Sequence, residues 1–94
     1  MAKEDRSDPD RNNTAQALAL ESLGWLISEP DRAQRLLALT GLEPQQLRQR
    51  LGDPSLLEAV IAFLESHEPD LIACAAALQV SPERLVAARQ ELMR

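Results

Sequence analysis

Residues 41–64 read GLEPQQLRQRLGDPSLLEAVIAFL and hold the signals that decide the fold. Two glycines, Gly41 and Gly52, each stand two or three residues before a proline. Glycine readily adopts the left-handed conformation that ends a helix, and proline is favoured at the first position of the next one. The stretch therefore predicts a helix that ends at Gly41, a short helix from Pro44 to Gly52, and a longer, apolar helix that begins at Pro54.

The same signals continue on both sides of this stretch and predict an all-α chain. Asn13 or Thr14 is suited to cap a first helix over roughly 14–28, because a short polar side chain can accept from a free N–H group at the helix start. The prolines that begin three further helices are Pro30, Pro69 and Pro82. No stretch alternates apolar and polar residues for long enough to make a strand. We expect a single small bundle of about six short helices.

The fifth expected helix, residues 70–79, has an unusual composition. Its interior reads LIACAAAL over residues 71–78 and is apolar on nearly every side. A helix without a polar face is typical of an element surrounded by neighbours. We therefore expect this helix to be the central one.

The two halves of the chain repeat a pattern. Trp25-Leu26 precedes a Glu-Pro-Asp triplet, as Phe63-Leu64 does, and residues 42–47 align with residues 80–85, at a spacing of 38 or 39. Glu-Pro-Asp is also a common way to begin a helix. The pattern leaves open whether the chain is built from two related three-helix units.

Length and charge limit the class of protein. Ninety-four residues are enough for one small domain, and the net charge of −5 disfavours binding to nucleic acid or to an anionic membrane. Residues 1–13 hold seven charges and no large apolar residue after Met1, which predicts a disordered tail ahead of a helical domain over 14–94. A single cysteine, with no signal sequence or membrane span, predicts a cytoplasmic protein.

One stretch resembles a known family. Residues 37–44 read LALTGLEP, and together with Trp25-Leu26, Asp53-Pro54 and Phe63-Leu64 they resemble the bacterial domain-of-unknown-function family 3572 over roughly residues 15–93. The resemblance implies a small, helical, cytosolic chain. It implies no activity, substrate or catalytic residue.

Residues suited to catalysis are few. The chain has one histidine, His67, and one cysteine, Cys74, which lies in the apolar fifth helix and is expected in the core. His67 is expected at a helix C-terminus, where a positive charge is favourable. No spacing of His, Cys or carboxylate residues suits a metal, and no glycine-rich loop suits a phosphate. We therefore predict no enzyme, no catalytic residue, no metal and no cofactor.

The first helix supplies the leading functional prediction. It has two apolar faces, one of which contains Ala17, Leu20, Gly24 and Ile27. Because so small a domain cannot readily cover both faces, one of them is expected to meet a partner. We predict a non-enzymatic protein-interaction or self-associating module, with a homodimer or another protein as the partner. The candidate partner-binding residues are Trp25, Ile27 and Leu20.

The alternative is a nucleic-acid-binding protein of helix-turn-helix type that reads through the helix over residues 44–51. The residues that would contact the nucleic acid are Gln45, Arg48, Gln49 and Arg50. This alternative requires Arg32 and Arg35 to lie beside that helix. The first half of the chain (residues 14–52) has four arginines and four acidic residues, and the second half (residues 53–94) has three and seven. So few cations make nucleic acid a less expected partner than protein.

Overall fold

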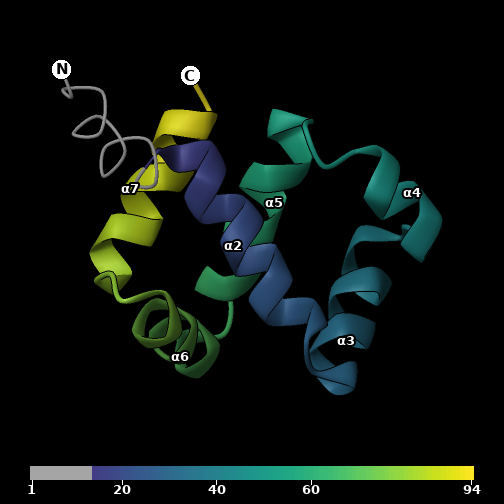
Figure 1. Cartoon of the computed structure of the whole chain (residues 1–94), viewed down its shortest axis with the longest axis horizontal. Coiled ribbons are helices and arrows are strands. Elements are labelled where there is room, and N and C mark those ends of the chain that lie inside the picture. Colours follow the sequence, from purple (N-terminus) through teal and green to yellow (C-terminus); the bar gives the residue numbers. More distant parts are fainter. Residues whose placement is uncertain (1–13) are drawn as a thin grey trace, which may run out of the picture.

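The computed structural model describes residues 14–94, which form six α-helices and no strand (Figure 1). The helices are α2 (Ala15–Ile27), α3 (Pro30–Thr40), α4 (Pro44–Gln49), α5 (Pro54–Glu65), α6 (Glu68–Leu78) and α7 (Pro82–Leu92). The prediction of an all-α chain with about six short helices is confirmed. The predicted tail over 1–13 lies outside the described residues.

Side chains cap the helix starts, and Thr14 does so as the sequence predicts. The Thr14 hydroxyl accepts from the backbone N–H of Ala17 at 3.1 Å. The Ser81 hydroxyl accepts from the N–H of Arg84 at 3.0 Å in the same way. Gly41 ends α3 in the left-handed conformation, with φ 73°, where a residue with a Cβ is strained. These three boundaries therefore follow from local chemistry.

Three helices build the core. In Figure 1, α2 crosses the front of the molecule diagonally, α5 lies behind it, and α7 runs alongside both. The most deeply buried large side chains of these helices are Leu18, Leu26, Leu57, Val60, Ile61, Leu64 and Leu85. Their burial is the main stabilising contribution in a chain of this size, because aliphatic surface is removed from water.

The prediction that the fifth helix is central is wrong. That helix is α6, which buries only Leu71, Cys74 and Ala75, while Ile72 is 51% exposed. The reason is that alanine adds little apolar surface, so an alanine-rich helix loses little free energy when several of its alanines face water. The central positions belong to α2 and α5.

The two halves share an order of elements but differ in their third helix. The helix α7 has 11 residues and packs against both α2 and α5. Its counterpart α4 has six residues, lies beside α3 at the edge of the molecule, and buries only Leu47 (Figure 1). The sequence predicted that this helix runs to Gly52, whereas it ends at Gln49. The first half therefore has no helix that corresponds to α7 in position.

Candidate functional site

The outward face of α2 carries an exposed apolar stripe. Leu20 is 37% and Ile27 48% exposed, and Gly24 between them is also exposed. An α-helix turns by about 100° per residue, so Leu20, Gly24 and Ile27 all lie within about 60° of one another around the helix axis. A methyl group added at Gly24 would meet no atom within 4 Å. We call Ala17, Leu20, Gly24 and Ile27 the α2 stripe.

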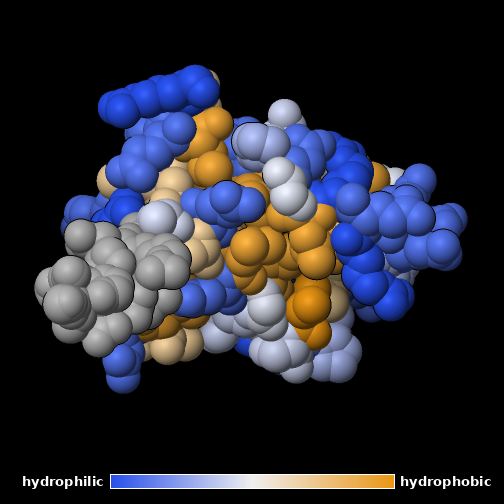
Figure 2. Space-filling model, turned by 45° about the horizontal axis from the view of Figure 1, so that its top comes forward, coloured by the Kyte–Doolittle hydropathy of each residue, from blue (hydrophilic) through white to orange (hydrophobic). Residues whose placement is uncertain are grey.

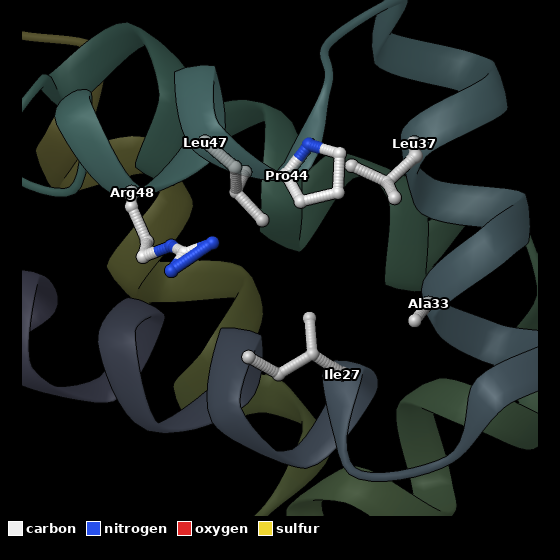
Figure 3. Close-up of a pocket in the computed structure, with 6 residues that line it drawn as sticks. All are labelled: Ile27, Ala33, Leu37, Pro44, Leu47 and Arg48. Carbon is white, nitrogen blue, oxygen red and sulfur yellow. The ribbon is translucent and has the colours of Figure 1, made fainter.

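A groove opens at the C-terminal end of the α2 stripe, between α2, α3 and α4. It has a volume of about 400 Å³ and is lined by Ile27, Ala33, Leu37, Pro44, Leu47 and Arg48. Figure 3 shows the side chains of Ile27, Leu37, Pro44 and Leu47 directed into one common space. The Arg48 guanidinium extends toward the same space (Figure 3). The Arg48 side chain makes no hydrogen bond or ion pair with any described residue, so the groove combines apolar walls with one available positive charge.

The α2 stripe and the groove belong to an apolar region of the molecular surface. Figure 2 shows hydrophobic residues gathered near the middle of this side of the molecule, with hydrophilic residues on both sides of them. Of the exposed large hydrophobic residues, Leu20 and Ile27 belong to the α2 stripe, and Ile27 also lines the groove. A contiguous apolar surface with a polar border is typical of a protein-interaction site.

Trp25 lies on a different side of α2 from the other two predicted partner-binding residues. It is half-buried, and the Arg32 guanidinium lies 3.8 Å from the centre of its ring. Arg32 Nη2 also donates to the backbone oxygen of Trp25 at 3.1 Å. This stacking and hydrogen bond fix the start of α3 against the end of α2. The structure thus brings Leu20 and Ile27 together and gives Trp25 a contact within the chain.

Sequence reasoning missed the groove. It assigned Ile27 to one functional hypothesis and Arg48 to the other, whereas the structure places both in the same groove. Proline and leucine in α4 were expected only as helix-forming and core residues. The sequence signal that could have revealed the groove is the short spacing between Gly41 and Gly52, because it limits the length of the helix between them and so how much of α2 that helix can cover.

The residues of the nucleic-acid alternative do not form a basic surface. Gln45, Gln49 and Arg50 are exposed on or next to α4. Arg50 donates to Asp53 Oδ2 through Nη2 at 2.8 Å and Nε at 3.1 Å, and this pairing lowers the pKa of the Asp53 carboxyl. Its positive charge is therefore already paired.

The other two arginines that this alternative requires are also engaged elsewhere. Arg32 stacks on Trp25, and Arg35 Nη2 lies 3.4 Å from Asp70 Oδ2, toward α6. The basic stripe beside α4 is not present in the described part of the chain. The structure gives this alternative no support beyond the exposure of Gln45, Arg48, Gln49 and Arg50.

The corner between α6 and α7 has the angle of a helix-turn-helix but not its free second helix. The two helices meet at 98°, within the range of that motif. However, α7 packs against α2 and α5, and Arg89 on it binds Glu58 at 2.6 Å and Glu65 at 2.9 Å.

None of the described helices is by itself long and apolar enough to cross a membrane, although the bent pair α6 and α7 together has the required length and composition.

The residues considered for catalysis do not converge. Cys74 is fully buried, as predicted, and burial raises the pKa of its thiol, which keeps it protonated and unreactive. His67 lies just beyond the end of α5, near the helix C-terminus that was expected, and it is also the N-cap residue of α6. Its side chain makes no cap hydrogen bond, and its Nδ1 is 3.3 Å from Asp70 Oδ2. Among residues 14–94 no group of three or more His, Cys, Asp or Glu side chains is placed to hold a metal ion.

Comparison with known proteins identifies a family. The model of the family described as "Protein of unknown function (DUF3572)" matches residues 12–94. The chain therefore belongs to the DUF3572 family, which confirms the resemblance drawn from residues 37–44. No curated protein and no solved structure matches the chain.

Proposed function

We propose that this member of the DUF3572 family is a non-enzymatic protein-interaction module that binds a partner helix along the α2 stripe and in the adjoining groove. The observation that carries the proposal is the exposure of Leu20 and Ile27 on either side of an open Gly24. Two large aliphatic side chains on one helix face gain free energy when a partner removes them from water.

The glycine in the α2 stripe supports a helical partner. Gly24 lies in the middle of the exposed face of α2, where glycine costs about 1 kcal/mol relative to alanine. No described part of the chain occupies the space above it, so packing within residues 14–94 does not explain the glycine. A glycine at this place lets the backbone of another helix approach closely, with Leu20 and Ile27 packing on either side of the contact.

In the second half of the chain, the corresponding face lies on α5 and is covered by another helix. The residues 38 positions after Leu20 and Ile27 are Glu58 and Glu65, and Arg89 of α7 binds both of them. That face is therefore polar and covered by a helix of the same chain. The α2 stripe is apolar, and among the described residues no helix covers it.

A photo-cross-linking experiment tests the proposal. A benzophenone amino acid replaces Leu20 in the full chain, expressed in the cells that produce the protein. The control carries the same group in place of Ile72 on α6, which is also an exposed apolar position. We expect a discrete cross-linked product from position 20 only, and its loss when Ile27→Asp is added. Mass spectrometry then identifies the protein in the product.

The result that would overturn the proposal is equally specific. If position 20 gives no product beyond the level seen from position 72, then the α2 stripe does not contact a partner. If Ile27→Asp leaves the product unchanged, then the contact does not depend on the apolar surface.

A further inference from the structure

We infer that the partner helix is α2 of a second copy of this chain, which crosses the first antiparallel at Gly24. The inference rests on the proposed function and names its partner. It follows from the way apolar and charged residues are distributed on the two edges of the α2 stripe.

The apolar edge of the stripe is complementary to itself. Leu20 and Ile27 lie on the same edge, on opposite sides of Gly24 along the helix axis. In an antiparallel crossing centred on Gly24, a twofold axis perpendicular to the helices places Leu20 of each copy beside Ile27 of the other. The helix axes then meet where the only side chain is a hydrogen atom, which permits a short interaxial distance.

Polar side chains border the α2 stripe on its other side, and we call them the polar edge. This edge is complementary to itself as well. Glu21 and Ser28 lie on this edge, and the Arg32 guanidinium is there too, because its Nη2 is 3.5 Å from Ser28 Oγ. Neither Glu21 nor Arg32 has an oppositely charged partner among the described residues. The antiparallel crossing places Glu21 of each copy near Ser28 and Arg32 of the other, so both charges gain a partner. A parallel crossing would instead place Leu20 and Ile27 against the polar edge.

The net charge of the chain also favours contact at this surface. The whole chain has a net charge of −5, but residues 14–52 have four arginines and four acidic residues and are neutral. The helix α2 itself has a single charged residue, Glu21, so two copies that meet through it bring few like charges together. This arrangement keeps electrostatic repulsion between the copies low.

The N-terminal segment of the chain is less suited to cover the stripe. Residues 1–13 contain no large apolar residue after Met1 and seven charged residues. Such a sequence has no side chains to pack between Leu20 and Ile27 or to fill the groove. An apolar helix is the required occupant, and α2 itself has only one charged residue, Glu21.

Cysteine cross-linking of the purified full chain tests the geometry. Gly24→Cys places a thiol on the proposed twofold axis, so mild oxidation is expected to give a disulfide-linked dimer. Leu20→Cys together with Ile27→Cys is expected to do the same, whereas Leu20→Cys alone is not, because the two copies of position 20 are about 12 Å apart along the axis. The natural Cys74 is buried, so the unmodified chain is the control and should form no disulfide-linked dimer under oxidation.

Sedimentation equilibrium gives a second readout that needs no new cysteine. We expect a concentration-dependent dimer, whose dissociation constant rises by about tenfold or more in Gly24→Leu. Glu21→Arg should raise it about two- to fivefold, since an exposed ion pair becomes a repulsion. Glu83→Arg on α7 changes the net charge equally and should not weaken the dimer.

Two results with the purified chain overturn the inference. The first is a chain that remains monomeric at all concentrations and forms no disulfide from Gly24→Cys. The second is efficient cross-linking of Leu20→Cys alone, which would indicate a parallel dimer. A different protein in the photo-cross-linked product from position 20 would also overturn the second copy as partner, but would leave the proposed function standing. The absence of any such product would overturn both.

Discussion

The two halves of this chain have the same order of helices and use their first helix differently. Residues 38 positions apart match in the core, where Leu26 and Leu64 are both fully buried. They differ on the outward face, where Leu20 corresponds to Glu58 and Ile27 to Glu65. The core positions fix how each helix packs, and the outward positions decide whether its other face is closed within the chain or left for a partner.

The length of the third helix in each half explains this difference. Arg89 lies in the last turn of α7 and reaches back to two carboxylates on α5. The residue 38 positions before Arg89 is Leu51, which lies beyond the end of α4. The first half therefore has no helix at the place from which α7 closes the outer face of α5. The additional residues of α7 relative to α4 therefore decide whether the outward face is covered within the chain, as on α5, or left exposed, as on α2.

Truncation of the matched core residues should have the largest effect. We expect Leu26→Ala and Leu64→Ala each to lower the free energy of unfolding by about 2–5 kcal/mol, because each leaves a cavity in the same core. Leu20→Ala on the outward face should lower it by less than about 1 kcal/mol. Urea denaturation of the three variants at low protein concentration measures this. If Leu26→Ala cost no more than Leu20→Ala, then the division of α2 into a core face and an open face would be wrong.

Removal of the positive charge of Arg89, which binds the two outward carboxylates of α5, should have the next largest effect on stability. Arg89→Leu leaves Glu58 and Glu65, both about three-quarters buried, without their cation. We expect it to lower the free energy of unfolding by about 1–3 kcal/mol. Adding Glu58→Leu and Glu65→Ile, the residues found in the first half, should restore most of that loss. A triple variant no more stable than Arg89→Leu would show that the ion pairs are not the reason for the loss.

Local and long-range features differ in how far the sequence could predict them. The helix starts were predicted to within two residues, because Thr14, Pro54 and Ser81 act on their immediate neighbours. That α2 has two apolar faces also follows from helical periodicity, but the exposed residues were predicted only in part, because Trp25 was placed with Leu20 and Ile27 and is half-buried on another side of the helix. The central helix was not predicted, because the burial of an alanine-rich segment depends on which larger side chains surround it. The groove was not predicted either, since Ile27 and Pro44 are separated by all of α3 and meet only in the folded chain.

Replacing the outward residues of α2 by the corresponding residues of α5 should remove partner binding with little effect on stability. Leu20→Glu with Ile27→Glu gives α2 the same two residues that α5 has at these positions. Because both side chains are exposed, we expect the free energy of unfolding to change by less than about 1 kcal/mol. Self-association should disappear. The photo-cross-link from a benzophenone amino acid placed at position 17 should disappear as well. Persistent association in a folded double variant, measured by sedimentation, would place the interface elsewhere.

The smallest effect is expected at the glycine of the α2 stripe, where the two halves differ by one methyl group. The residue 38 positions after Gly24 is Ala62, in the middle of α5. Gly24→Ala should raise the free energy of unfolding of the monomer by about 0.5–1 kcal/mol, because alanine favours the helix and the added methyl group meets no atom within 4 Å. Gly41→Ala is the matched control and should lower it, since Gly41 has φ 73°. Thermal unfolding of dilute protein measures both. If Gly24→Ala stabilises the monomer while it weakens the dimer, then the glycine lowers the stability of the isolated chain and permits the close contact between two copies of α2.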